Sequence, residues 1–294
     1  MRAPWLLAGA AALAVLVVTG DAAAFCRSTT CTKDCETDAD GCVTSGLQLW
    51  WKTSCIGYTI DPALTQNLPP EPTRDALRKS FFAWADLDCG GGQHASMTFA
   101  QLDDLSCHES WYRADGTNVN LVTFKDNDWT YRGIDGTLAK TTVTFDSKTG
   151  QILDADISIN SAYNNLTVGD AKVGYDLQSI MTHEVGHLLG VAHSFDFDAT
   201  MFPSYEPGTK ELRTLAPDDV KAVCAAYPPG RAAVCDTTPH GGLATSCPND
   251  EPASSGCATA PGGASSTSAV LLLLAGLARA GRRARRNGCS VVVG

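Results

Sequence analysis

The chain is 294 residues long, carries 12 cysteines and has a formal net charge of −10. This length allows one sizeable domain with extra segments at its ends, or two small domains. Residues 25–257 hold 31 acidic and 16 basic residues, so the body of the protein lacks the basic surface that nucleic-acid binding needs. We therefore expect no nucleic-acid partner.

Residues 1–24 have the layout of a secretory signal peptide. Arg2 is followed by an apolar run over residues 5–18 and by three small residues at 22–24. The run is short for a membrane span, although a retained anchor is the alternative. We expect an exported protein, located outside the cell or at its surface. In that setting the cysteines predict disulfides rather than reduced thiols, with their pairing left open.

Residues 25–49 form a cysteine-rich segment with Cys26, Cys31, Cys35 and Cys42. The segment is too polar to build a core, so we expect crosslinks to restrict its unfolded conformations. A zinc-binding cysteine cluster is the alternative interpretation, and export makes it the less favoured one.

Residues 50–229 have the pattern of a single α/β domain. Apolar alternation predicts strands at 56–60, 97–100, 119–124, 141–145 and 152–159, and the last two are arranged as a hairpin. Helical periodicity predicts helices at 73–87, 176–189 and 217–227. Thr73 is a suitable cap for the first helix, and Gly190 suits a left-handed end to the second.

The segment from residue 183 to residue 193 reads HEVGHLLGVAH. His183 and His187 are four residues apart, so on a helix they offer imidazoles to one metal ion. Glu184 is placed to reach water on that metal, and Gly190 lets the chain turn and bring in His193 as a third ligand. Three protein ligands leave the fourth position of a tetrahedral zinc open for water, which is typical of a catalytic site.

The chemistry expected of such a site is peptide-bond hydrolysis. Zinc lowers the pKa of its bound water from ~16 to near 7, and Glu184 is the expected base that accepts the water proton and passes it to the leaving nitrogen. A bare HExxH often arises by chance, whereas the extended form is far more specific. A surface-attached binding module that keeps zinc without turnover is the rival hypothesis.

The extended motif resembles that of the metzincins, whose Met-turn lies under the zinc site. Met201 in the stretch ATMFPSY, eight residues after His193, matches that methionine. Ser194 after the third histidine and the sequence pattern Met-Phe-Pro-x-Tyr resemble those of the matrixin branch. Trp84 matches a helix tryptophan of the family. The resemblance covers nearly all of the predicted domain. It implies an α/β (α+β) fold with a twisted five-stranded mixed sheet, three helices and an active-site cleft.

The resemblance also implies roles in substrate binding. Leu138 and Ala139 resemble the edge strand along which matrixins align substrate, and Pro203 and Tyr205 would wall the pocket for the side chain after the scissile bond. Ser179, one helical turn before the motif, is expected to line that pocket and leave it roomy for bulky apolar side chains.

Two departures from the family concern metals. Lys140 and Ile157 stand where histidine ligands of a second, structural zinc are expected, so we expect one catalytic zinc ion only. Calcium bound by Asp154 or Asp156 is an alternative to a simple solvated acidic face on that strand.

The last part of the chain changes composition. Residues 230–256 are rich in Pro, Gly and Ser and are expected to form a linker with Cys235 and Cys247 as its fixed points. Residues 257–294 begin at Cys257 and continue with an apolar run and a cluster of arginines. They resemble a myxobacterial carboxy-terminal sorting signal, which implies processing near Cys257 and cell-surface attachment. An ordinary membrane anchor with a basic flank is the alternative.

Together these features predict an exported or surface-attached, monomeric zinc endopeptidase. Its expected substrates are extracellular proteins and peptides, in nutrition or in remodelling of extracellular matrix.

Overall fold

The computed structural model describes residues 25–85, 87–129, 137–248 and 288–293. The predicted signal peptide (1–24) and residues 249–287 of the tail, which include Cys257 and the arginine cluster, lie outside the described residues. Among the helices that are described, none combines the length and the apolar content that crossing a bilayer requires.

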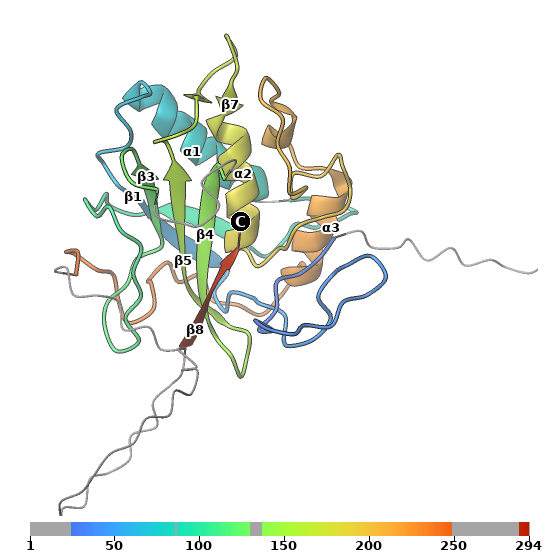
Figure 1. Ribbon diagram of the computed structural model, residues 1–294. Coiled ribbons are helices and arrows are strands. Elements are labelled where there is room, and N and C mark those ends of the chain that lie inside the picture. Colours follow the sequence, from blue (N-terminus) through green and yellow to red (C-terminus); the bar gives the residue numbers. More distant parts are fainter. Residues whose placement is uncertain (1–24, 86, 130–136, 249–287, 294) are drawn as a thin grey trace, which may run out of the picture.

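The predicted mixed sheet is confirmed. Its five core strands follow the spatial order β2-β1-β3-β5-β4 (Figure 1). β1 pairs in parallel with β2 and β3, β3 pairs in parallel with β5, and β4 is antiparallel to β5. The strands are β1 (Cys55–Ile60), β2 (Thr98–Gln101), β3 (Leu121–Lys125), β4 (Ala139–Asp146) and β5 (Ile152–Asn160).

The three predicted helices are also present. The first begins at Pro70, three residues before the expected Thr73, because a proline at the first helical position fits the helix without losing a hydrogen bond. Thr73 instead lies inside the first turn, and its hydroxyl donates to Pro69 O at 2.8 Å. The helices are α1 (Pro70–Trp84), α2 (Leu177–Leu188) and α3 (Pro217–Ala226), with the short elements β6 (Leu166–Thr167), β7 (Tyr175–Asp176) and η1 (Glu211–Arg213).

Helices α1 and α2 cover one face of the sheet (Figure 1). α1 buries Leu77, Phe81 and Trp84, which are almost wholly excluded from solvent. α2 lies against β4 and β5, whose residues Val143 and Ile157 are fully buried. The histidine motif therefore begins on the helix with the largest share of buried residues.

The opposite face of β5 carries Asp154 and Asp156. The chain that crosses this face between β2 and β3 covers them, and the backbone N–H groups of Trp111 and Leu121 donate to Asp156 at 3.1 and 2.8 Å. Each aspartate is only 2% exposed, so the expectation of a solvated acidic face is wrong. The covering segment is irregular and has no periodicity from which its position could be predicted.

Ten cysteines are paired in five disulfides, which confirms the expected oxidised state. Two of the bonds fasten residues 230–248, the first part of the predicted linker, against the domain. The pairs are Cys26–Cys42, Cys31–Cys35, Cys55–Cys235, Cys89–Cys224 and Cys107–Cys247.

The cysteine-rich segment packs against the turn that follows α2. Cys26 O accepts the backbone N–H of Ala192 at 3.0 Å, and the backbone N–H of Ser28 donates to Gly190 O at 3.0 Å. The buried guanidinium of Arg27 donates to Gly190 O (3.2 Å) and to Leu49 O (2.5 Å). The segment therefore braces the stretch of chain that leads to the third histidine of the motif.

A sixth strand that the sequence pattern did not predict extends the sheet. β8 (Gly288–Val293) pairs antiparallel with β4, and Val293 lies opposite Thr141 (Figure 1). The chain end therefore points toward the Ala139 end of β4. β4 would otherwise be an open edge with free backbone groups, which a β-branched segment such as Ser-Val-Val-Val is well suited to pair.

Candidate functional site

The ends of α2 are fixed by local chemistry. At its start, the carboxylate of Asp176 accepts the backbone N–H of Ser179 at 2.9 Å. At its end, Gly190 has φ +81°, and a β-carbon there would lie 2.9 Å from Leu49 O. The predicted left-handed helix end is thus present, and both the backbone angle and the close approach require glycine.

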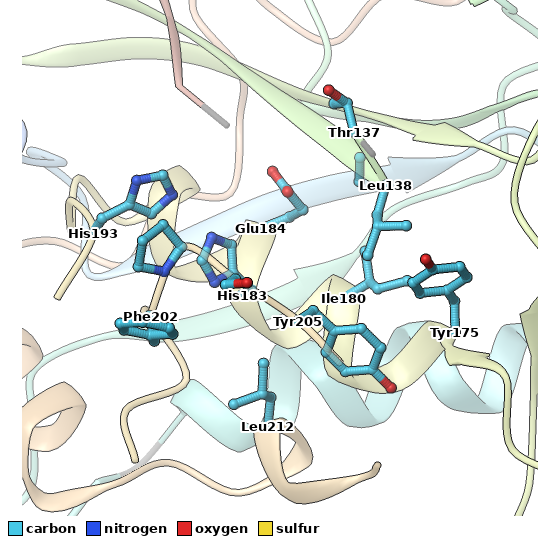
Figure 2. A pocket seen from close by; sticks show the side chains of 13 residues that line it. Thr137, Leu138, Tyr175, Ile180, His183, Glu184, His193, Phe202, Tyr205 and Leu212 are labelled. Carbon is cyan, nitrogen blue, oxygen red and sulfur yellow. The ribbon is translucent and has the colours of Figure 1, made fainter. Parts of the chain in front are cut away.

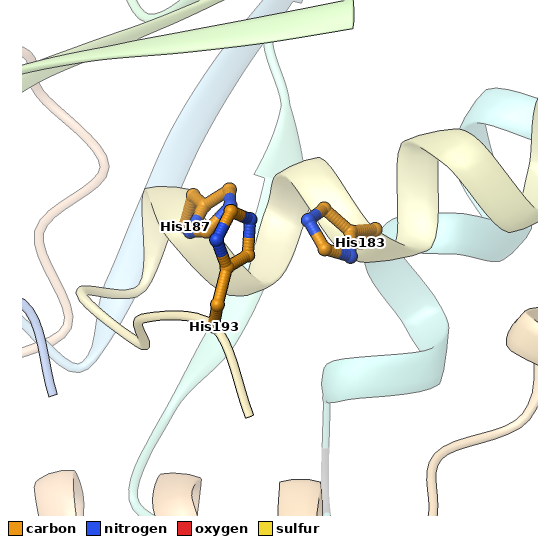
Figure 3. Close-up of side chains that lie close together, drawn as sticks. All are labelled: His183, His187 and His193. Atoms are coloured by element: carbon orange, nitrogen blue, oxygen red, sulfur yellow. The ribbon is translucent and has the colours of Figure 1, made fainter. Parts of the chain in front are cut away.

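The three motif histidines lie together. Their candidate ligand atoms are all within 4.8 Å of one another, and they form the only such cluster of three or more metal-binding side chains among the described residues. Figure 3 shows His183 and His187 on α2 and His193 on the chain beyond it. Nδ1 of His183 donates to Thr200 O at 2.7 Å, and Nδ1 of His187 donates to Val191 O at 2.9 Å. These bonds leave the Nε2 lone pairs free to face a metal ion.

The histidine set fits zinc. Nε2 of His187 and Nε2 of His193 are 3.2 Å apart, close to the ~3.3 Å that separates two nitrogens on a tetrahedral zinc with normal bond lengths. Burial lowers the pKa of all three rings, that of His183 to about 4. The imidazoles are therefore neutral at physiological pH, which is the form that binds metal.

Met201, the methionine that the resemblance singled out, packs against α2 within the motif, where a β-carbon at Gly186 would lie 2.2 Å from its Sδ. It is fully buried, and its backbone O accepts from Ser194 N at 2.8 Å. Asp219 of α3 accepts the N–H groups of Thr200 and Met201 at 2.8 and 3.1 Å. The turn is thus tied both to the residue after His193 and to α3.

Glu184 lines the same cavity as His183 and His193 and is 4% exposed. Burial raises its pKa to about 7, against the opposing effect of the Thr141 hydroxyl. That hydroxyl lies 2.5 Å from Glu184 Oε2 and 3.1 Å from its backbone O. Thr141 was not singled out from the sequence, because only the pairing of β4 with its neighbours brings it above α2.

A cavity of about 330 Å³ opens beside the histidines (Figure 2). Of the residues to which the resemblance assigned substrate contacts, Leu138, Ala139, Pro203 and Tyr205 line it. The full lining comprises Thr137, Leu138, Ala139, Tyr175, Ile180, His183, Glu184, His193, Phe202, Pro203, Ser204, Tyr205 and Leu212.

Ser179 is not among the lining residues. It is fully buried, and its hydroxyl donates to Asp176 at 2.9 Å. The neighbouring Ile180 faces the cavity instead, because Asp176 holds the serine as part of the helix cap.

The wall around Tyr205 is anchored to the start of α2. The phenol oxygen of Tyr205 accepts from Asp176 N at 3.0 Å and donates to Thr209 O at 2.7 Å. Arg213 of η1 donates to both carboxylate oxygens of the fully buried Asp176, at 2.7 and 2.5 Å. Leu212, next to this ion pair, therefore has a fixed place in the cavity lining.

Residues 50–228 match the family model for matrixin. The chain is 28% identical over 183 residues to Metalloendoproteinase 1-MMP of Arabidopsis thaliana, which covers 61% of this chain and 44% of that protein. It is 32% identical over 195 residues to Matrix metalloproteinase-20 of Homo sapiens (65% and 35%). It is also 27% identical over 203 residues to Interstitial collagenase A of Mus musculus (67% and 38%). The chain thus spans less than half the length of these relatives.

The family match covers more than half of the chain and contains the whole histidine cluster, Glu184 and the Met-turn. The chain belongs to the matrixin family.

Proposed function

We propose that this protein is an exported zinc-dependent endopeptidase with Glu184 as its general base. The observation that carries the proposal is the convergence of three neutral histidine nitrogens beside a buried carboxylate, at the edge of an open cavity. His183, His187 and His193 would hold one zinc ion. A purely structural site would need neither the carboxylate nor the cavity.

A bound zinc ion would supply a water of lowered pKa and a Lewis acid for the substrate carbonyl. The protein supplies the rest. Glu184 accepts the proton of the attacking water and later transfers it to the leaving nitrogen. Thr141 holds the Glu184 carboxylate in place through its hydroxyl. The Nδ1 hydrogen bonds to Thr200 O and Val191 O fix the orientation of the first two histidines.

Substrate binding follows from the edge of the sheet. β8 pairs with β4 from Thr141 to Asp146 and leaves Leu138 and Ala139, which line the cavity, outside that pairing. An extended peptide that adds alongside these two residues passes over the histidines. The cavity lining includes Ile180 and Leu212, so we propose that the cavity accepts a bulky apolar side chain after the scissile bond.

The setting of this activity is also part of the proposal. Five disulfides favour an oxidising, extracellular location for a monomer that acts on extracellular proteins and peptides. The sorting-signal resemblance of residues 257–294 favours cell-surface attachment.

Metal removal is the direct test of the function. The full chain, expressed for export and purified, is expected to cleave casein and members of a quenched peptide library, and a zinc chelator is expected to abolish cleavage. Zinc added back should restore activity and raise the unfolding temperature, because the metal binds only the folded state. Metal analysis should give one zinc per chain. Folded, zinc-loaded protein that cleaves none of these substrates would favour the rival binding module.

Calcium is the less favoured occupant of the buried Asp154–Asp156 pair. Calcium takes six to eight oxygen ligands, and both carboxylate oxygens of Asp156 already accept backbone N–H groups. Within the described part of the chain, Asp154 Oδ1 has no hydrogen-bond partner. Burial raises the pKa of both aspartates, that of Asp156 to about 8. We therefore propose that the pair holds protons rather than calcium.

Replacing Asp154 with asparagine is expected to flatten the pH dependence of stability. Both pKa values lie above those of an unfolded chain, so the stabilising protonation is complete at low pH and is lost as the pH rises toward 8. Asparagine keeps the shape of aspartate and carries no charge. The difference in free energy of unfolding, variant minus parent, should therefore be about 1–2 kcal/mol more favourable to the variant at pH 8.5 than at pH 5.5. Thermal unfolding at both pH values checks this. Parallel pH profiles, or a calcium-dependent rise in unfolding temperature, would contradict it.

A further inference from the structure

The loop between His193 and Pro203 presents aromatic rings to solvent. Phe195 is 57% exposed and Phe197 is 79% exposed. A single exposed apolar side chain needs no explanation, whereas a contiguous apolar surface beside a cleft marks a binding site. The arrangement of the rings decides whether these are isolated exposed side chains or parts of one apolar surface.

Phe197 is continuous with the cavity. Its ring lies 4.7 Å, centre to centre, from the ring of Phe202, and Phe202 lines the cavity. Figure 2 shows Phe202 beside His193, whereas Tyr205 and Tyr175 lie on the other side of His183. Phe195 is different, because its ring packs over Gly41 of the cysteine-rich segment. The two rings of Phe197 and Phe202 therefore form one apolar surface that runs from the cavity outward.

The backbone that carries Phe197 is well anchored. The hydroxyl of Ser194 donates to the buried Asp218 at 2.6 Å and accepts from Asp196 N at 3.0 Å. Asp196 in turn accepts the N–H of Asp198 on its side chain (3.1 Å) and the N–H of Ala199 on its backbone O (3.1 Å). A turn bonded in this way fixes the backbone of Phe197, whose ring contacts Phe202 of the cavity lining.

We propose that Phe197 and Phe202 form a second apolar subsite, which takes a bulky aliphatic or aromatic side chain that precedes the scissile bond. This inference rests on the proposed function. A peptide that places one side chain in the inner cavity around Tyr205 crosses the histidine cluster, so its preceding residues reach the His193 end where Phe202 lies. A substrate side chain there covers apolar ring surface that is otherwise in water, which favours binding.

Peptide binding tests the subsite without requiring turnover. The zinc-loaded Glu184→Gln chain is titrated with two labelled, alanine-rich peptides that carry a leucine for the inner cavity. One peptide has leucine and the other has serine at the three positions before that leucine. The expected result is about tenfold tighter binding of the leucine-rich peptide.

The Phe197→Ser change, added to the Glu184→Gln chain, should reduce this preference to about twofold. Phe82→Ser is the matched control, because Phe82 is 68% exposed on α1, which contributes no residue to the cavity lining. The control should retain the full preference. An unchanged preference in the Phe197→Ser chain overturns the subsite. The two proposals can fail separately. If the Phe197→Ser change removes the binding preference but the chain with Glu184 intact cleaves no peptide, the subsite is supported and only the proposed hydrolysis is refuted.

Discussion

Replacing Glu184 with glutamine is expected to lower kcat/KM for peptide cleavage by about a thousandfold or more. Glutamine has nearly the same shape as glutamate and can still accept from the Thr141 hydroxyl. It cannot accept a proton from the attacking water, so the loss should appear in kcat rather than in KM. The three histidines are untouched, and zinc content should remain that of the parent. Steady-state kinetics together with metal analysis check both parts.

The fold of the variant provides the internal control. Glu184 is a buried carboxylate whose pKa is raised by burial, so a neutral amide should leave the unfolding temperature equal or higher. A glutamine variant that keeps a tenth or more of the parental rate would remove Glu184 from the role of base. Loss of zinc together with loss of rate would instead assign the residue to the metal site.

Local sequence signals predicted most of the site. Helical spacing placed His183 and His187 side by side, and Gly190 predicted the turn that returns His193. These features depend only on backbone geometry within eleven consecutive residues, so no tertiary information is needed to read them. The strands and helices could be predicted for the same reason, because the periodicity of apolar residues that indicates them is local.

Long-range contacts account for most of what the sequence did not predict. Thr141 reaches Glu184 only after β4 has paired with β5, and Asp154 is buried by an irregular segment with no pattern of its own. Ser179 was expected at the cavity because of its helical position, but the Asp176 cap holds its hydroxyl. β8 adds to β4 from nearly 150 residues away. Apart from the Asp176 cap, which is local, the partner in each case is distant in sequence and leaves no local trace.

Gly186 illustrates this difference and leads to the second large effect. In a helix, replacing glycine with alanine usually stabilises by about 1 kcal/mol. Here a β-carbon at position 186 would lie 2.2 Å from Met201 Sδ and 2.8 Å from Trp84 Cζ2. The Trp84 ring is held by a 2.7 Å bond from Nε1 to Thr182 O, and Asp219 holds the backbone of Met201, whose side chain is fully buried and has little room to move. Gly186→Ala is therefore expected to destabilise the fold by about 3 kcal/mol.

A double-mutant cycle separates this clash from a general helix effect. Met201→Ala removes the sulfur that meets the new methyl group, so Gly186→Ala combined with Met201→Ala should be less destabilised than the sum of the single changes, by about 1 kcal/mol or more. Chemical unfolding of the four proteins gives the coupling energy. If Gly186→Ala instead stabilises the chain, or if the two changes are simply additive, the contact does not constrain the site. If the coupling is found, Gly186 is the residue that allows the Met-turn to pack directly against the helix bearing His183 and His187. The methionine side chain then sets the position of the helix that carries these two histidines.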